Sequence, residues 1–186
     1  MQSIQQRSIL DTHHLLNRLG LSAGMHVADF GSGGHAHYVR PMAERVGKNG
    51  SVYIVDVRSG PLSALHSQMR QYGHDHVVPV RADIEVFGGT GLLDDQFDRV
   101  TMVNMLHQTI SPHAALREAS RVLHPAGLLL VVDWEKSLAG IGPTANNFLL
   151  SDAVVVAAES NGLVLVQHFD ASSVHYGLLF AKNRNA

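Results

Sequence analysis

The residues best suited to chemistry lie in the stretch VADFGSGG, where an acid and three glycines accompany a short apolar run. Gly31, Gly33 and Gly34 permit sharp turning and the close approach of a ligand that a Cβ would block. Asp29 can orient this loop or accept a hydrogen bond from a ligand amine. A glycine turn between a strand and a helix exposes backbone amides to a ligand at the carboxyl ends of the strands. The alternative is a plain tight connection between two elements.

A second acid, Asp56, ends the next apolar run, SVYIVD, and stands 25 residues after Gly31 (56 minus 31). At this distance from a glycine turn, a carboxylate can hold both hydroxyls of a ribose. We therefore expect a nucleoside-containing ligand, with Asp56 as a surface carboxylate that binds it. Capping of the following helix is the structural alternative for Asp56.

The elements that must position these residues alternate between strand-like and helix-like hydrophobic patterns. Runs typical of strands buried on both faces are HVADF, SVYIVDV, HVVPVRADI, FDRVTMVNML and GLLLVVDW. Helix-like stretches lie at 37–46, 60–72 and 112–123, after a first one at 4–19. This alternation predicts βαβ units and a parallel sheet covered on both faces. Asp83 and Asn104 then end the third and fourth strands.

The last part of the chain breaks this alternation. After the helix-like stretch LSDAVVVAAESNGL come two strand-like runs, LVLVQHFDA and HYGLLFAK, with too few residues between them for a crossover helix. They should pair as an antiparallel hairpin. The expected fold class is therefore α/β: a Rossmann-like, doubly wound, mostly parallel seven-stranded sheet that ends in an antiparallel hairpin.

Composition limits the classes of function. The chain has 186 residues, of which 45% are hydrophobic, which suits one core. We expect a single domain over 1–186, with an N-terminal helix over 1–20 and a cofactor-binding core over 21–182. The 14 basic and 16 acidic residues form no basic cluster, which disfavours nucleic acid and anionic membrane as partners. Without cysteine, disulfides and thiolate chemistry are excluded.

The N-terminal stretch MQSIQQRSILDTHHLL lacks the basic start and apolar core of a signal peptide. No apolar run approaches the roughly 20 residues of a membrane span, so we expect a cytoplasmic protein. The 13 histidines form no HxxxH or HExxH motif and have no supporting acidic cluster, so no metal site is predicted. The sequence leaves a homo-oligomer open.

The chain resembles class I S-adenosylmethionine-dependent methyltransferases, above all the small methyltransferase domains related to those of ubiquinone and menaquinone biosynthesis. The segments that carry the resemblance are VADFGSGG, VYIVDV, RADI, FDRVTMVNMLHQ, LREASRVLHPAGLLLVVDW and the final hairpin. RVLHPAG is the most specific of them. The resemblance implies methyl transfer from S-adenosylmethionine to an unidentified small-molecule acceptor by direct in-line displacement.

The resemblance also implies which residues bind the cofactor. They are Asp29, Gly31, Ser32, Gly33 and Gly34 at its methionine part, Asp56 at its ribose, Val57, Ala82, Asp83 and Ile84 at its adenine, and Asn104 and Met105 beside the sulfonium. One position departs from the family pattern, because His35 stands where a third glycine is usual. We therefore expect a remodelled glycine loop.

Methyl transfer needs an aligned nucleophile and, when that nucleophile is protonated, a group that removes its proton. His107 after the fourth strand and Glu135 after the fifth are the candidate catalytic residues, with Tyr38 and His175 as further ones. Each of these side chains could instead have a purely structural role.

Two other functions stay open. One is a non-catalytic protein that binds S-adenosylmethionine or S-adenosylhomocysteine, or a regulatory protein, which the altered glycine loop favours. The other is a nicotinamide-dependent oxidoreductase, which shares the glycine turn and Asp56. The terminal hairpin and RVLHPAG argue against the oxidoreductase.

Overall fold

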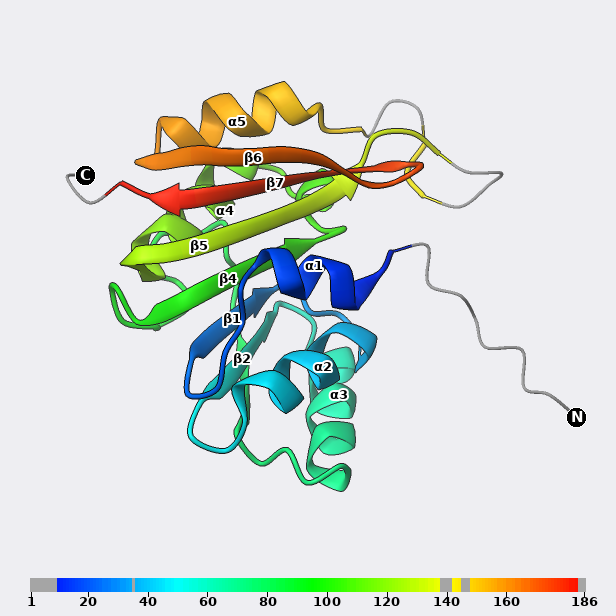
Figure 1. The fold of residues 1–186 in the computed structure, drawn as a ribbon, viewed down its shortest axis with the longest axis vertical. Coiled ribbons are helices and arrows are strands. Elements are labelled where there is room, and N and C mark those ends of the chain that lie inside the picture. The colour runs from blue at the N-terminus through cyan, green and yellow to red at the C-terminus, as the bar shows by residue number, and fades with distance from the viewer. Residues whose placement is uncertain (1–9, 35, 138–141, 145–147, 184–186) are drawn as a thin grey trace, which may run out of the picture.

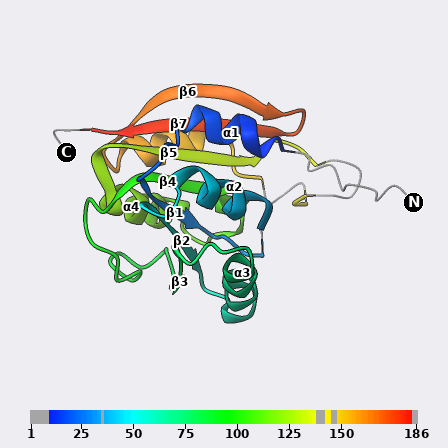
Figure 2. The same cartoon turned by 60° about the horizontal axis from the view of Figure 1, so that its bottom comes forward.

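A single seven-stranded sheet forms the centre of the protein. The structure is a computed structural model, and it describes residues 10–34, 36–137, 142–144 and 148–183. The strands are β1 (His26–Phe30), β2 (Ser51–Asp56), β3 (Val77–Arg81), β4 (Phe97–Val103), β5 (Leu123–Trp134), β6 (Leu163–Ser172) and β7 (His175–Lys182). Figure 1 shows most of the sheet, and Figure 2 shows β3 at its edge beyond β2.

The sheet has the order β3-β2-β1-β4-β5-β7-β6. The pairs β1–β2, β2–β3, β1–β4 and β4–β5 are parallel, whereas β7 pairs antiparallel with both β5 and β6. The fold class expected from the sequence is thus confirmed. The chain leaves β1 toward β3 and later returns to β4 on the other side of β1, so the strand order reverses between β1 and β4. Open α/β sheets bind ligands at such a switch point, beyond the carboxyl ends of the strands.

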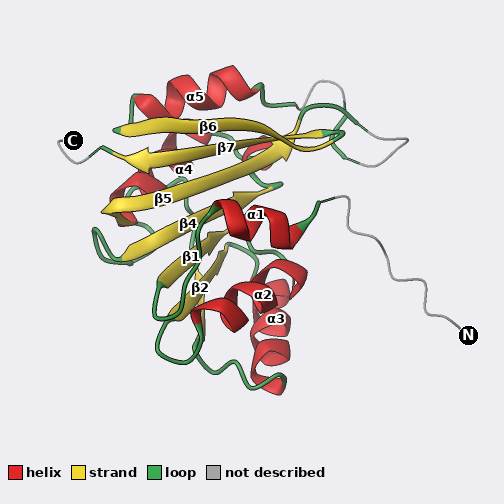
Figure 3. Cartoon of the chain, in the orientation of Figure 1, coloured by secondary structure: helices red, strands yellow, loops and turns green. Residues whose placement is uncertain are grey.

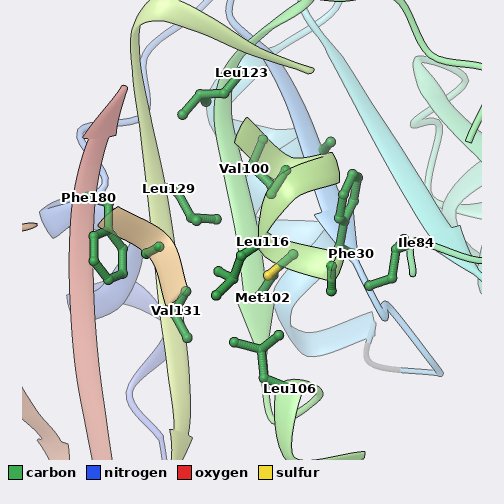
Figure 4. Close-up of a cluster of buried hydrophobic side chains, with 14 of the residues drawn as sticks. Phe30, Ile84, Val100, Met102, Leu106, Leu116, Leu123, Leu129, Val131 and Phe180 are labelled. Carbon is green, nitrogen blue, oxygen red and sulfur yellow. The ribbon is translucent and has the colours of Figure 1, made fainter. Parts of the chain in front are cut away.

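Helices cover both faces of the sheet, as Figure 3 shows. The helices α1 (Thr12–Arg18), α2 (Ala36–Val46) and α3 (Ser59–Gln71) share one apolar cluster, and α4 (Pro112–Val122) and α5 (Ser151–Glu159) share another. In Figure 4, Leu116 of α4 lies beside Met102 of β4 in this second cluster. A short 3₁₀ helix, η1 (Leu106–Gln108), follows β4. In the described part of the chain, no helix is long and apolar enough to cross a membrane.

Local sequence explains where the helices begin. The Asp11 side chain accepts a hydrogen bond from the His14 amide at 3.0 Å and so caps α1. The Ser111 hydroxyl accepts one from the Ala114 amide at 3.2 Å and caps α4, whose first residue is Pro112. Each cap satisfies an amide that has no partner within its helix.

Three boundaries differ from the sequence-based expectation. The first helix begins at Thr12, while residues 4–9 of the helix expected over 4–19 lie outside the described residues. The third strand ends at Arg81, so Asp83 lies two residues beyond it. The fifth strand begins at Leu123, and its pairing with β4 shifts register before Leu128. Pro125 lies in the irregular part of β5, where the proline nitrogen, which cannot donate a hydrogen bond, is tolerated.

Candidate active site

A cavity of about 250 Å³ lies beyond the carboxyl ends of β1, β2, β3 and β4. Seven of the residues expected to bind the cofactor line it: Gly31, Asp56, Val57, Ala82, Asp83, Ile84 and Met105. Ile84 is buried, whereas Val57 is exposed and forms part of the rim. The residues expected at a ribose and an adenine therefore come together at the switch point of the sheet.

Gly31 and Met105 form the wall of this cavity between β1 and β4. Gly31 has a φ of 74°, in the left-handed region that favours glycine. A Cβ on Gly31 would lie 2.8 Å from the Cβ of Met105, closer than real side chains approach. The glycine is therefore required both by its backbone conformation and by the methionine that packs against it.

Asp29 lies near the end of β1 that leads into the glycine loop and does not line the cavity. It is only 4% exposed, and its Oδ1 accepts a hydrogen bond from the Thr101 hydroxyl at 2.6 Å. Burial raises the pKa of Asp29 to about 6, although the Thr101 bond opposes this shift. No salt bridge within the described residues neutralises the carboxylate. It is a natural partner for a cationic group of a ligand.

The carboxylate of Asp56 is held from two sides. Oδ2 accepts from the Gly33 amide at 2.8 Å, and Oδ1 accepts from the Arg58 amide at 2.8 Å. The Arg58 guanidinium adds contacts of 3.1 Å to Oδ1 and 3.2 Å to Oδ2. Burial alone would raise the pKa of Asp56, but the bonds from Arg58 and Gly33 outweigh it and lower the pKa.

The expectation that Asp56 is a surface carboxylate is wrong, because it is only 5% exposed. The glycine loop folds over the end of β2 and covers it through the Gly33 amide. Ser32 and Gly33 are buried in this loop, Gly34 is exposed, and none of the three lines the cavity. His35, the departure from the family pattern, lies outside the described residues.

Asn104 directly follows β4 and has a strained backbone. Its φ is 54°, a left-handed value that non-glycine residues seldom adopt. Its side-chain Oδ1 is buried and has no hydrogen-bond partner among the described residues. A strained residue with an unsatisfied buried acceptor is typical of a ligand-binding position. Asn104 precedes Met105 in the cavity wall without lining the cavity itself.

His107, in η1, contacts a carboxylate that sequence analysis did not single out. Its Nδ1 lies 2.6 Å from Oδ1 of Asp133 at the end of β5, and its amide donates to Oδ2 at 3.0 Å. The His107 side chain is 11% exposed and that of Asp133 is 1% exposed. The pair occupies the carboxyl ends of β4 and β5, and the residues that follow His107 line the cavity.

The other candidate bases have different surroundings. Glu135 is exposed on the rim beyond β5. His175 is buried, and its Nδ1 lies 2.8 Å from the Ser172 hydroxyl; burial lowers its pKa to about 4. Tyr38 is buried in α2, and burial raises the pKa of its phenol. Among these four, only His107 combines partial exposure with an orienting carboxylate.

Sequence reasoning missed several residues of the site. The cavity is also lined by Val55, Arg58, Glu85, Gln108 and Thr109. All five lie within two residues of a predicted one: Val55 precedes Asp56, and the other four follow predicted residues along the chain. Within the described residues, no group of three or more histidine or acidic side chains could hold a metal ion.

The fold and the site define a Rossmann-like domain of the methyltransferase class. A family model described as "Methyltransferase domain" matches residues 28–131, which is more than half of the chain. The chain belongs to this family. The resemblance seen in the sequence is thereby confirmed, and so is S-adenosylmethionine as the cofactor of the family to which the chain belongs.

Individual relatives agree with this assignment. The ubiquinone/menaquinone biosynthesis C-methyltransferase UbiE of Laribacter hongkongensis is 33% identical over 132 residues, which are 70% of this chain and 52% of the relative. The chain thus spans about half the length of the curated relatives it matches.

Two solved structures share the fold. A SAM dependent methyltransferase from Aquifex aeolicus superimposes with a TM-score of 0.83 at 24% identity, covering 92% of this chain and 89% of that one. The [4+2]-cyclase SpnF superimposes with a TM-score of 0.78 at 17% identity, covering 92% of this chain and 80% of that one.

Proposed function

We propose that this chain transfers a methyl group from S-adenosylmethionine to a small-molecule acceptor. The observation that carries the proposal is the cavity at the switch point, where the carboxylate of Asp56 and the glycine turn of Gly31 lie side by side. Membership of the methyltransferase domain family supports it. The proposal keeps the cytoplasmic location expected from the sequence.

The residues around the cavity fit this cofactor. In the proposal, Asp56 binds the ribose hydroxyls, and Val57, Ala82, Asp83 and Ile84 surround the adenine. Asp29 lies near the amino group, Gly31, Ser32, Gly33 and Gly34 form the loop around the methionine part, and Asn104 and Met105 border the sulfonium. The buried, unneutralised carboxylate of Asp29 suits an ammonium group, and the unsatisfied Oδ1 of Asn104 suits a ligand donor.

When bound, S-adenosylmethionine supplies a methyl carbon that is already electrophilic. The protein must then align the acceptor and remove its proton where it carries one. In the proposal, His107 takes this proton, because its ring is partly exposed and is oriented by Asp133. Glu135 on the exposed rim is the second candidate for the base.

A second candidate function is a non-catalytic protein that binds S-adenosylmethionine or S-adenosylhomocysteine. A neighbour in structure is named a cyclase, so the fold alone does not distinguish methyl transfer from other uses.

One experiment separates the two functions. The purified protein is incubated with S-adenosylmethionine and the small-molecule fraction of a cell extract, and S-adenosylhomocysteine is quantified by mass spectrometry. Methyl transfer predicts product that depends on the added fraction and is lost in Asp56→Asn. Binding of S-adenosylmethionine without product in any fraction would favour the non-catalytic alternative.

A further inference from the structure

Asp133 is a buried carboxylate at the end of β5, and both of its oxygens have hydrogen-bond partners. Oδ1 accepts from the Trp134 amide at 2.8 Å and lies 2.6 Å from Nδ1 of His107. Oδ2 accepts from the His107 amide at 3.0 Å. The two amides fix the carboxylate in place, one from β5 and one from η1. The imidazole is therefore held by a rigid partner.

This arrangement determines which nitrogen of His107 carries the proton. An ionised carboxylate can only accept hydrogen bonds, so the short contact requires a proton on Nδ1. The lone pair of the neutral ring is then on Nε2, the nitrogen that faces away from Asp133. A carboxylate that orients a histidine in this way also stabilises the imidazolium that forms when Nε2 takes a proton.

Other groups near Asp133 do not compete for it. No lysine or arginine within the described residues forms a salt bridge with it. His175 lies on β7, where its Nδ1 contacts Ser172 and its ring is 4.0 Å from that of Trp134. Burial lowers the pKa of His175 to about 4, so it is neutral near physiological pH and offers Asp133 no positive charge.

We propose that Asp133 is the positioning residue of a His107–Asp133 pair, which presents Nε2 as a base to an acceptor whose nucleophile is a phenol or enol hydroxyl. The pair lies beside the cavity, because Met105, Gln108 and Thr109 of the same segment line it. The choice of acceptor rests on the proposed methyl transfer, whereas the role of Asp133 toward His107 does not.

The acceptor class follows from what a neutral imidazole can add to the reaction. A thiol, with a pKa of about 8.5, ionises readily, and a neutral amine already has a free pair. A phenol, with a pKa of about 10, is un-ionised at neutral pH and gains most from a base. The proton passes from the hydroxyl to Nε2, and the electron pair of the O–H bond stays on the acceptor. The resulting anion uses an electron pair on its oxygen, or on the adjacent unsaturated carbon, to form a bond to the methyl carbon. The S–CH3 bond breaks at the same time, and its electron pair stays on sulfur.

Nuclear magnetic resonance of the full chain labelled with ¹⁵N-histidine tests the role of Asp133 without any ligand. Long-range ¹H–¹⁵N correlations at mildly alkaline pH show which ring nitrogen is protonated, and the signals missing in His107→Gln identify His107 among the 13 histidines. We expect the proton on Nδ1 in the natural chain and a shift toward Nε2 in Asp133→Asn, whose amide can donate to Nδ1. His113→Gln, at an exposed histidine of α4, should leave these signals unchanged. A proton on Nε2 in the natural chain would overturn the proposal, even if Asp133→Asn fails to fold.

Methyl transfer to hydroquinone, aniline and thiophenol tests the acceptor class. We expect transfer to hydroquinone, with kcat lowered on the order of 100-fold in Asp133→Asn and KM little changed. Transfer to thiophenol, where detected, should be nearly unaffected by Asp133→Asn. Transfer to aniline or thiophenol alone, or to none of the three by a protein that binds S-adenosylmethionine, would overturn the acceptor class. If S-adenosylmethionine does not bind at all, the proposed function fails instead, and the histidine signals still decide the role of Asp133.

Discussion

Arg58 and the glycine loop both hold the carboxylate of Asp56, but they do so in different ways. The amides of Gly33 and Arg58 each take one oxygen, and these backbone bonds can remain when a ligand binds. The guanidinium takes the remaining acceptor positions, which are those that two ribose hydroxyls would need. The Arg58 side chain is 60% exposed, so it is free to move into solvent. If Asp56 binds the ribose as proposed, the Arg58 side chain competes with the cofactor for it.

Replacing Arg58 by alanine should strengthen the binding of S-adenosylmethionine. Because the Arg58 side chain is exposed, its ion pair with Asp56 should contribute at most about 1 kcal/mol, so we expect Kd to fall by up to about fivefold. Isothermal titration calorimetry measures the change, with Arg40→Ala as control, because the Arg40 side chain on α2 is similarly exposed and also pairs with an acid, Glu44. Weaker binding in Arg58→Ala would show that Arg58 contacts the cofactor instead of competing with it.

Asp29 should make folding stability depend on pH in a recognisable direction. Its pKa is raised from 3.8 to about 6 in the folded state, so the folded protein holds a proton that the unfolded chain has released. Stability should therefore fall as pH rises from about 4 to about 6. The amide introduced by Asp29→Asn cannot titrate and keeps an acceptor for Thr101. The free energy of unfolding of Asp29→Asn relative to the natural chain should therefore increase across the same pH range, by at most about 3 kcal/mol.

Urea unfolding of the natural chain and of Asp29→Asn at several pH values measures this difference in stability directly. The comparison cancels the contributions of other titrating carboxylates, since both chains contain them. A stability difference that does not change between pH 4 and pH 6 would contradict the raised pKa of Asp29.

Local patterns in the sequence predicted only part of the site. Asp29 and Asp56 lie near the ends of strands and Gly31 follows one, in a recognisable spacing, so their positions could be inferred. Asp133 could not be paired with His107 in this way, because the contact joins the ends of two neighbouring strands that are 26 residues apart in the chain. Arg58 was missed for a different reason: nothing in the sequence indicates that an arginine turns back onto the acid two residues before it.

At the scale of elements, α4 holds the connection between β3 and β4, whose first residues line the cavity. Glu118 of α4 is fully buried and accepts from the Gly88 amide at 2.8 Å and from the Arg121 Nη2 at 2.7 Å. Arg121 in turn donates to the Leu92 carbonyl at 2.9 Å. The connection between β3 and β4 is thus tied to the helix by a buried charge pair. Burial alone would raise the pKa of Glu118, but the bonds from Arg121, Thr90 and Gly88 outweigh it and lower the pKa.

Glu118→Gln should destabilise the fold by about 2 kcal/mol at neutral pH. The value lies below the usual range for breaking a buried pair, because Arg121 keeps its second partner, Asp94. Since the folded pKa of Glu118 is depressed below 4.5, the stabilisation is present above this pH and is lost as pH falls through the lowered value. Urea unfolding at neutral and acidic pH checks both statements. Glu44→Gln, at an exposed pair, should change stability by less than about 0.5 kcal/mol; an equally small effect at Glu118 would contradict the argument.

Most elements could be predicted because, in each segment, the period of the hydrophobic residues and the length of the segment indicate the same type of element. The runs HVADF and HYGLLFAK coincide with β1 and β7, and the predicted helices begin and end within one residue of α2, α3 and α4. The boundaries that differ lie where strands become irregular. Leu123 pairs with Phe97 before the register shifts, a long-range contact that no local period reveals.

At the scale of the whole molecule, the cavity exists because the strand order reverses between β1 and β4. The loops after these strands diverge to opposite sides of the sheet, so backbone amides and acids at the strand ends are left facing a shared space. The chain belongs to the methyltransferase domain family, and the sequence alone sufficed to infer this, because motifs spread over nearly the whole chain carry the resemblance. The acceptor could not be inferred, because it depends on the side chains around His107 and not on the fold.

The central claim is that the cavity binds S-adenosylmethionine through Asp56. Isothermal titration calorimetry of the purified chain with S-adenosylmethionine, S-adenosylhomocysteine and NAD tests it most directly, with Asp56→Asn measured alongside. We predict micromolar binding of the first two ligands, none of NAD, and loss of binding in a folded Asp56→Asn variant. Absence of binding of both S-adenosyl compounds, or binding that Asp56→Asn leaves unchanged, would contradict the account.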